Sequence, residues 1–243
     1  MFRTTLFAGL MLATPLVAQM EMTDAEREAF RTEIRAYLLD NPEVLMEAIA
    51  ILEQRQANAQ AEADVAMLST NAAALYEDDF SWVGGNPDGD ITIVEFMDYR
   101  CSFCKRAYPE VEALIASDGN IRYIIKEFPI LGEQSILASQ FAVATKLVAG
   151  DEAYKDVHNT LMEYRGDVNG PALERIGETL GLDTAAILER AGTPEVMEII
   201  SRNRALGQRL AINGTPSFVI EDQLLRGYLT LEQMQQVVAQ ERG

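Results

Sequence analysis

Apolar residues recur at helical spacing from residue 23 to about residue 76, in a stretch rich in Ala, Glu and Gln. Thr23, with Glu26 three residues later, is typical of a capping box that begins a first helix. Asn41-Pro42 interrupts the pattern, and Pro42 suits the first turn of a second helix. The two predicted helices carry apolar stripes, formed by Phe30, Ile34, Tyr37 and Leu38 and by Val44, Leu45, Ala48, Ile49 and Leu52.

Residues 19–79 are therefore expected to form a helical arm with one apolar face. Because this arm precedes a complete-looking core, we expect its apolar face to join copies of the chain into a homo-oligomer. Packing of the arm on its own domain is the alternative.

Beyond residue 80 the pattern changes to short β-branched and aromatic runs. Residues 80–83, 91–97 and 121–128 are of strand type, and residues 105–115 form a helix with apolar faces. The last two strands with the helix between them predict a βαβ unit with parallel strands and a right-handed crossover.

Residues 133–211 contain no strand-like run. They predict a block of helices, separated by the breaks at Gly150-Asp151, Asn169-Gly170 and Gly192-Thr193-Pro194. Strand patterns return at 217–220 and 224–228, and Thr230 suits the cap of a last helix over 231–240. This order predicts an α/β fold in two parts, 80–131 and 211–243, interrupted by an inserted all-helical domain at 132–210.

Residues 1–18 are typical of a secretory signal peptide, with Arg3 ahead of an apolar run and Leu16-Val17-Ala18 as its exit. A buried N-terminal helix is the alternative. The run is short for a membrane span and contains Pro15. We expect a soluble chain exported to the periplasm after cleavage.

The net charge of the chain limits the classes of molecule that it is expected to bind. The chain has 20 Lys and Arg against 38 Asp and Glu, a formal net charge of −18. Such a balance argues against binding to nucleic acid or to anionic membrane surfaces.

The chemistry centres on Cys101 and Cys104, the only cysteines of the chain. A strand that leads into Cys-x-x-Cys at the start of a helix is typical of a redox site, because the helix N-terminus stabilises the first thiolate. A structural disulfide would close too small a loop to stabilise much, and zinc needs about four ligands, whereas His158 is the only histidine. Two thiolates can hold Cu(I), so copper binding stays open as an alternative. We predict no metal and no cofactor.

A second motif is Gly214-Thr215-Pro216, directly before the strand that starts at Ser217. Proline fits a strand start, where no ladder N–H is needed, and a cis Thr215–Pro216 bond would aim the Thr215 backbone toward the cysteines. Together with Glu95-Phe96-x-Asp98-Tyr99-x-Cys101-x-x-Cys104 and the helical insertion, this motif resembles the thioredoxin-fold DsbA family. The arm makes the chain most similar to the ScsC-like and Com-type branch of exported disulfide oxidoreductases.

The resemblance implies a role for each site residue. Cys101 would be the nucleophile and Cys104 the resolving thiol, with the cis-proline Pro216 and the preceding Thr215 facing them. Glu95 would be the buried acid beneath the disulfide and the proton acceptor for Cys104, and a solvent-facing position on an edge strand is the alternative. Lys126 either pairs with Glu95 or ends its strand in solvent, and His158 is expected at the surface or in packing.

The expected function is thiol–disulfide exchange with unfolded or misoxidised exported proteins, with a membrane redox partner that resets the cysteines. Ser102-Phe103 stands where the DsbA family has Pro-His, so a donor and a possible positive charge near the thiolate are missing. This difference and the arm favour a disulfide isomerase or reductase. A DsbA-like dithiol oxidase and a Cu(I)-binding protein are the alternatives.

Overall fold

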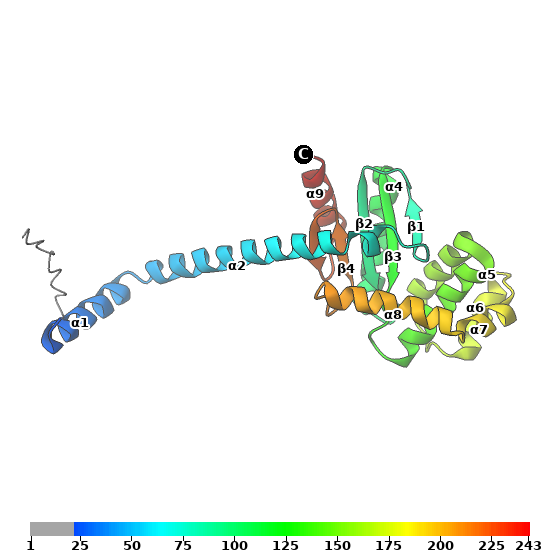
Figure 1. The fold of residues 1–243 in the computed structure, drawn as a ribbon, viewed down its shortest axis with the longest axis horizontal. Helices are drawn as coiled ribbons and strands as arrows, with labels where there is room; N and C mark the ends of the chain where they lie inside the picture. The colour runs from blue at the N-terminus through cyan, green and yellow to red at the C-terminus, as the bar shows by residue number, and fades with distance from the viewer. Residues whose placement is uncertain (1–21) are drawn as a thin grey trace, which may run out of the picture. The chain divides into compact units, whose positions relative to one another are not determined.

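A computed structural model describes residues 22–243 (Figure 1). The predicted signal peptide at residues 1–18 lies outside the described residues. The chain divides into two compact units, Met1–Gln56 and Ala57–Gly243, which we describe separately.

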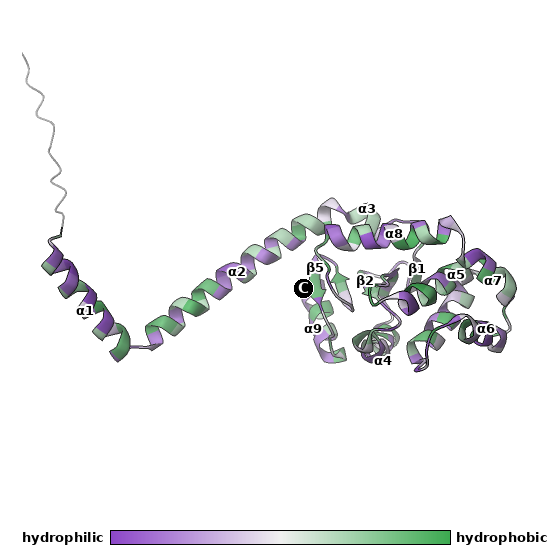
Figure 2. Ribbon diagram, turned by 90° about the horizontal axis from the view of Figure 1, so that it is seen from below, coloured by the Kyte–Doolittle hydropathy of each residue, from purple (hydrophilic) through white to green (hydrophobic). Residues whose placement is uncertain are grey.

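The first unit contains α1 (Asp24–Asp40) and the beginning of α2 (Glu43–Thr70). The capping box predicted for α1 is present, because the Glu26 amide donates to the Thr23 hydroxyl at 3.3 Å and the Thr23 amide donates to the Glu26 carboxylate at 2.8 Å. The helix ends before Pro42, as predicted. None of the residues of α1 is buried, and Figure 2 shows apolar and polar residues interleaved along α1 and α2.

The second unit begins earlier in the chain than the sequence predicted. The end of α2 and the short helix α3 (Ala72–Tyr76) pack on the sheet, and Leu68 and Leu75 are buried in a core that includes Val94 and Phe96. The predicted limit of the arm near residue 79 therefore lies inside the larger unit, whose boundary falls between Gln56 and Ala57.

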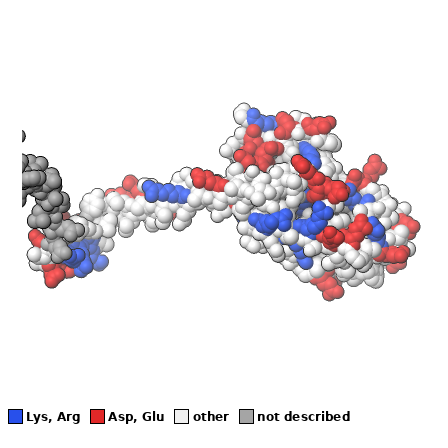
Figure 3. Space-filling model, viewed as in Figure 1, with Lys and Arg blue, Asp and Glu red and all other residues white. Residues whose placement is uncertain are grey.

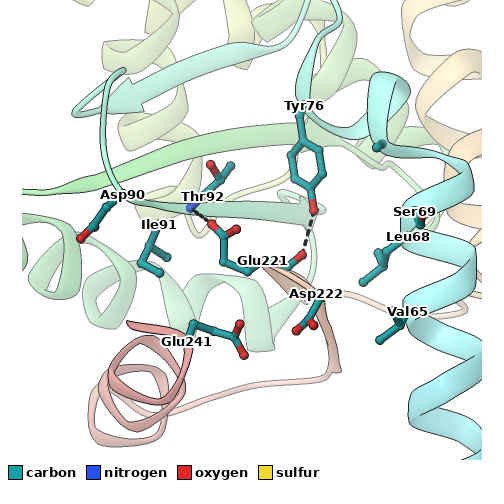
Figure 4. A pocket seen from close by; sticks show the side chains of 11 residues that line it. Val65, Leu68, Ser69, Tyr76, Asp90, Ile91, Thr92, Glu221, Asp222 and Glu241 are labelled. Atoms are coloured by element: carbon teal, nitrogen blue, oxygen red, sulfur yellow. Dashed lines mark hydrogen bonds between the residues drawn. The ribbon is translucent and has the colours of Figure 1, made fainter. Parts of the chain in front are cut away.

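Polar contacts also attach this segment to the sheet. Both terminal nitrogens of the Arg226 guanidinium donate hydrogen bonds to the Asp64 carboxylate, at 2.8 and 2.9 Å. The Tyr76 hydroxyl donates to the backbone oxygen of Glu221 at 2.8 Å, and the side chain of Glu221 accepts from the Thr92 amide (Figure 4). Glu221 thus joins α3 to β2, because both its backbone and its side chain are used.

Lys126 differs from both expectations for it. Its side chain is fully buried and pairs with Asp78, not with Glu95, and it also donates to the backbone oxygen of Ala74 at 3.0 Å. Desolvation lowers the pKa of Lys126, while the adjacent Asp78 carboxylate opposes that shift. This buried ion pair therefore attaches residues 74–78 to β3.

The sheet has the strand order β1-β3-β2-β4-β5. The strands β2 (Ile91–Met97) and β3 (Ile121–Glu127) are parallel and adjacent, as the βαβ pattern predicted. The other pairings are antiparallel and involve β1 (Trp82–Gly85), β4 (Ser217–Ile220) and β5 (Gln223–Arg226). β1 begins two residues later than predicted, because Phe80 and Ser81 instead donate their amides to the Asp78 carboxylate.

Helices cover both faces of the sheet. One face packs against α4 (Ser102–Asp118), α9 (Leu231–Arg242) and the insertion, and the other against α3 and the end of α8. The insertion consists of α5 (Glu133–Glu163), α6 (Gly170–Thr179), α7 (Thr184–Ala191) and α8 (Pro194–Arg209). Gly150 interrupts α5 with a φ of 88°, which matches the predicted break at this residue.

Acidic and basic side chains are interspersed on the face of the larger unit drawn in Figure 3. Among residues 22–243, no helix combines the length and the apolar character needed to cross a membrane.

The buried Lys126–Asp78 pair makes a prediction about stability. Asp78→Asn removes the partner of a buried ammonium and should cost about 3 kcal/mol or more in the free energy of unfolding. Glu195→Ala breaks the more exposed Arg190–Glu195 pair and should cost about 1 kcal/mol or less. Urea denaturation of both variants measures the difference, and equal losses would contradict a stabilising role for the buried pair.

Candidate active site

Cys101 is the N-cap residue of α4, directly after the loop that follows β2. Its extended backbone places the sulfur over the first turn of the helix, where the Cys104 amide donates to Sγ at 3.4 Å. Cys101 is 6% exposed and Cys104 is fully buried, and both are free thiols. Only the first of the two sulfurs is therefore placed to meet a reaction partner.

The two thiols differ in acidity. The hydrogen bond with the Cys104 side chain is the main cause that lowers the pKa of Cys101 to about 5, assisted by Thr215 and by the amides of Cys104 and Phe103. Burial raises the pKa of Cys104 far above its ordinary value, and the nearby Glu95 and Cys101 raise it further. At neutral pH the arrangement thus holds one thiolate and one thiol.

The Thr215–Pro216 peptide bond is cis, and the Cys101 thiol donates to the backbone oxygen of Thr215 at 3.1 Å. Pro216 is buried and directly precedes β4, which pairs with β2. The structure thus brings together Cys101, Cys104, Thr215 and Pro216, although the two motifs lie 114 residues apart in sequence.

Glu95 lies in the middle of β2 and is 2% exposed. Desolvation raises its pKa to about 7, although a hydrogen bond from the Tyr123 hydroxyl opposes that shift. Its other oxygen, Oε1, has no hydrogen-bond partner among the described residues. A buried carboxyl group with one free oxygen can take up a proton near neutral pH.

The family follows from the chain's match to known domains. Residues 92–239 match the DSBA-like thioredoxin domain, which covers more than half of the chain. The chain belongs to the DSBA-like thioredoxin family. Membership of this family makes thiol–disulfide exchange the activity class of the domain. Residues 26–59 match the N-terminal domain of the copper resistance protein ScsC, which places this second match on the arm.

Solved structures show the same DSBA-like fold. A thioredoxin-like oxidoreductase from Silicibacter pomeroyi DSS-3 is 41% identical, with a TM-score of 0.65, and the match covers 70% of this chain and 96% of that chain. A linker-deletion mutant of Proteus mirabilis ScsC is 27% identical, with a TM-score of 0.68, over 93% of this chain and 99% of that one. A periplasmic thioredoxin-like protein from Salmonella enterica serovar Typhimurium is 27% identical, with a TM-score of 0.62, over 70% and 94%.

Among curated proteins, a match is the Na⁺/H⁺ antiporter NhaA 1 of Salinispora arenicola, 26% identical over 157 residues. The match covers 64% of this chain and 24% of the antiporter, so the chain spans about a quarter of that relative's length.

Sequence reasoning missed another buried carboxylate of this DSBA-like domain. Glu127 ends β3, is 3% exposed, and accepts hydrogen bonds from the hydroxyls of Tyr99, Tyr154 and Ser139. His158 belongs to the same cluster and is buried in packing, with its Nδ1 3.2 Å from the Tyr99 hydroxyl. The available signal was the position of Glu127 at the end of an apolar strand, next to Lys126.

The raised pKa of Glu95 predicts how stability depends on pH. Its ordinary value is 4.5 and its value in the fold is about 7, so between these pH values the folded chain holds a proton that the unfolded chain has lost. This stabilisation is full below pH 4.5 and is lost as the pH rises through 7. The wild type should therefore lose about 3 kcal/mol relative to Glu95→Gln between about pH 4 and about pH 8.

Denaturation of both proteins across this pH range tests that expectation. Glu178→Gln, at an exposed position on α6, is the control and should track the wild type. If the difference between wild type and Glu95→Gln does not change with pH, Glu95 does not titrate in this range.

Proposed function

We propose that this chain is an exported thiol–disulfide oxidoreductase that exchanges disulfides with client proteins through Cys101 and Cys104. The observation that carries the proposal is the pairing of a stabilised Cys101 thiolate at the start of α4 with a buried Cys104 thiol beside it. A low-pKa sulfur is the one that attacks, and a protonated neighbour within the same turn can later resolve the product.

The reaction begins when the Cys101 thiolate attacks one sulfur of a client disulfide. A mixed disulfide forms, and the other client sulfur leaves as a thiolate. In shuffling, a client thiolate attacks the client sulfur of the mixed disulfide and restores the Cys101 thiolate. In reduction, Cys104 loses its proton and attacks Cys101, so that the client leaves with a thiol and the two cysteines form a disulfide.

Glu95 supplies the base for the second route. Its raised pKa and the free Oε1 suit it to accept the Cys104 proton at neutral pH, and the negative charge of Glu95 also acts on Cys104. Thr215 and Pro216 line the approach to Cys101, since the Thr215 backbone oxygen lies 3.1 Å from the Cys101 sulfur. The proposed catalytic site therefore consists of the two cysteines, Glu95, Thr215 and Pro216.

The residues between the cysteines favour isomerase or reductase activity. Ser102 and Phe103 are both exposed, and Phe103 presents 55% of its surface to solvent. An apolar ring beside the reactive sulfur suits contact with unfolded chains, whereas a cation there would stabilise the thiolate further and favour an oxidase.

The arm is proposed to join copies of this chain. In the first unit, Phe30 and Tyr37 are 57% and 55% exposed. A hollow of about 620 Å³ there is lined by the apolar residues Met22, Phe30, Ile34, Leu38, Leu39 and Leu45 and by Arg27, Arg31 and Arg35. Apolar surface of this extent favours association, and the occupant we propose is the arm of a second copy. Oligomerisation would place several Cys101 sites around one misoxidised client.

The proposed compartment is the periplasm, since residues 1–18 have the pattern of a signal peptide and one similar structure is of a periplasmic protein. A shuffling enzyme needs its cysteines reduced, so we propose a membrane redox partner that returns them to that state.

Trapping tests the assignment of the two cysteines. Cys104→Ser leaves the Cys101 thiolate able to attack but removes the thiol that releases the client, so mixed disulfides should accumulate on non-reducing gels. Cys101→Ser should trap no clients. Trapping by both variants, or by neither, would contradict the assignment, and tight Cu(I) binding without any thiol exchange would favour the copper-binding alternative.

Removal of residues 19–56 tests the arm. Because the larger unit begins at Ala57, the shortened protein should remain folded, be a monomer by light scattering and keep Cys101 reactivity. Refolding of a scrambled-disulfide substrate should fall more than reduction of insulin. A monomeric full-length protein would refute the assembly, and normal shuffling by the shortened protein would separate assembly from isomerase activity.

A further inference from the structure

Glu127 is the centre of a buried polar cluster formed by Tyr99, Ser139, Tyr154 and His158. The hydroxyls of Tyr99 and Tyr154 both donate to Glu127 Oε1 at 2.7 Å, and the Ser139 hydroxyl donates to Oε2 at 2.6 Å. All these side chains are buried. Burial of this carboxylate without hydrogen-bond partners would cost several kcal/mol, and the three hydroxyl donors remove that cost.

The hydrogen bonds of this cluster have a definite direction. Tyr99 has a single hydroxyl hydrogen, and it is used on Glu127, so the Tyr99 oxygen accepts from His158 Nδ1 at 3.2 Å. The His158 ring also stacks on Tyr154 at 6.1 Å between centroids. The hydrogen bonds therefore run from His158 of α5 through the Tyr99 hydroxyl to Glu127 at the end of β3.

Tyr99 connects this cluster to the reactive thiol. It lies two residues before Cys101, in the loop of residues 98–101 that joins β2 to α4. The same loop is held by the Cys101 amide, which donates to the Asp98 backbone oxygen at 3.0 Å, and by the buried Asp98 carboxylate, which accepts from the Arg100 amide at 2.7 Å. Two side chains of this loop reach the helical insertion: Arg100 donates to the Gly166 backbone oxygen at 2.8 Å, and Tyr99 links Glu127 of β3 to His158 of α5.

Resting on the proposed function, we infer that Glu127 is a positioning residue for thiol exchange, which holds the Cys101 loop in place through the Tyr99 hydroxyl. The Glu127 carboxylate hydrogen-bonds to the three hydroxyls and to neither cysteine. It acts by keeping the Cys101 sulfur over the first amides of α4, where the thiolate is stabilised. Above the pKa of Glu127, which desolvation raises to about 7, the hydrogen bond from Tyr99 is charge-assisted and about twice as strong as a neutral one.

The chain offers a matched pair of variants. Tyr99→Phe and Tyr154→Phe each remove one hydroxyl that donates to the same oxygen at the same distance, 2.7 Å. Both side chains are buried, but only Tyr99 belongs to the loop that carries Cys101. A purely structural role for the cluster predicts equal effects, whereas a positioning role predicts a difference at Cys101.

The readout is the ultraviolet absorbance of the Cys101 thiolate against pH, measured in the full-length reduced protein beside its rate with a small aromatic disulfide. Tyr99→Phe should raise the pKa of Cys101 by about half a unit, roughly a threefold loss of thiolate below that pKa. Tyr154→Phe should leave that pKa unchanged. Equal pKa values of Cys101 in the two variants would overturn the inference.

A second pair separates the hydrogen bond from the side-chain volume. Glu127→Gln keeps an acceptor oxygen for Tyr99 and should retain most of the Cys101 reactivity, whereas Glu127→Leu removes the acceptor and should behave like Tyr99→Phe. Should Glu127→Leu fail to fold, the tyrosine pair still decides the question. A wild-type protein that does not react with disulfides would instead refute the proposed function, so the two failures are distinguishable.

Discussion

One sulfur at the N-terminus of one helix sets the requirements that the surrounding elements meet. Cys101 is the N-cap of α4, so the chain must turn between the end of β2 at Met97 and Cys101. The partner thiol must lie in the first turn, and Cys104 does. The segment before β4 must also lie close to the Cys101 sulfur. The pairing of β4 with β2 brings Thr215 to that position. Together these elements keep the Cys101 sulfur ionised and accessible to a reaction partner.

Buried ionisable groups of the larger unit are satisfied in three different ways. Lys126 has a carboxylate partner, Asp78, beneath the surface. Glu127 has three hydroxyl donors. Glu95 has one hydroxyl donor and one oxygen without a partner among the described residues. A structural role favours full satisfaction of a buried group, so the incomplete satisfaction of Glu95 is consistent with a group that exchanges a proton.

Local sequence signals predicted most of the elements and the candidate site. The β-branched run of β2, the capping box at Thr23 and the break at Gly150 all depend on neighbours within a few residues, which a sequence displays directly. Glu95 could be placed in the core because its strand is apolar throughout. By contrast, the partner of Lys126 is 48 residues away, and the attachment of α3 depends on Glu221, 145 residues beyond Tyr76. Contacts at such separations are selected by packing, so periodicity alone could not reveal them.

The two edges of the sheet have a consequence for a protein proposed to meet unfolded chains. β1 and β5, the outer strands, are four residues long each, and β1 ends in Gly84-Gly85. Arg226, the last residue of β5, also pairs with Asp64 of α2. Short outer strands present few unpaired backbone groups, so an extended client has little opportunity to add itself as a further strand. In the proposed function, contact with a client would thereby be directed to side chains and to the thiol, and the sheet would be protected from co-aggregation with unfolded clients.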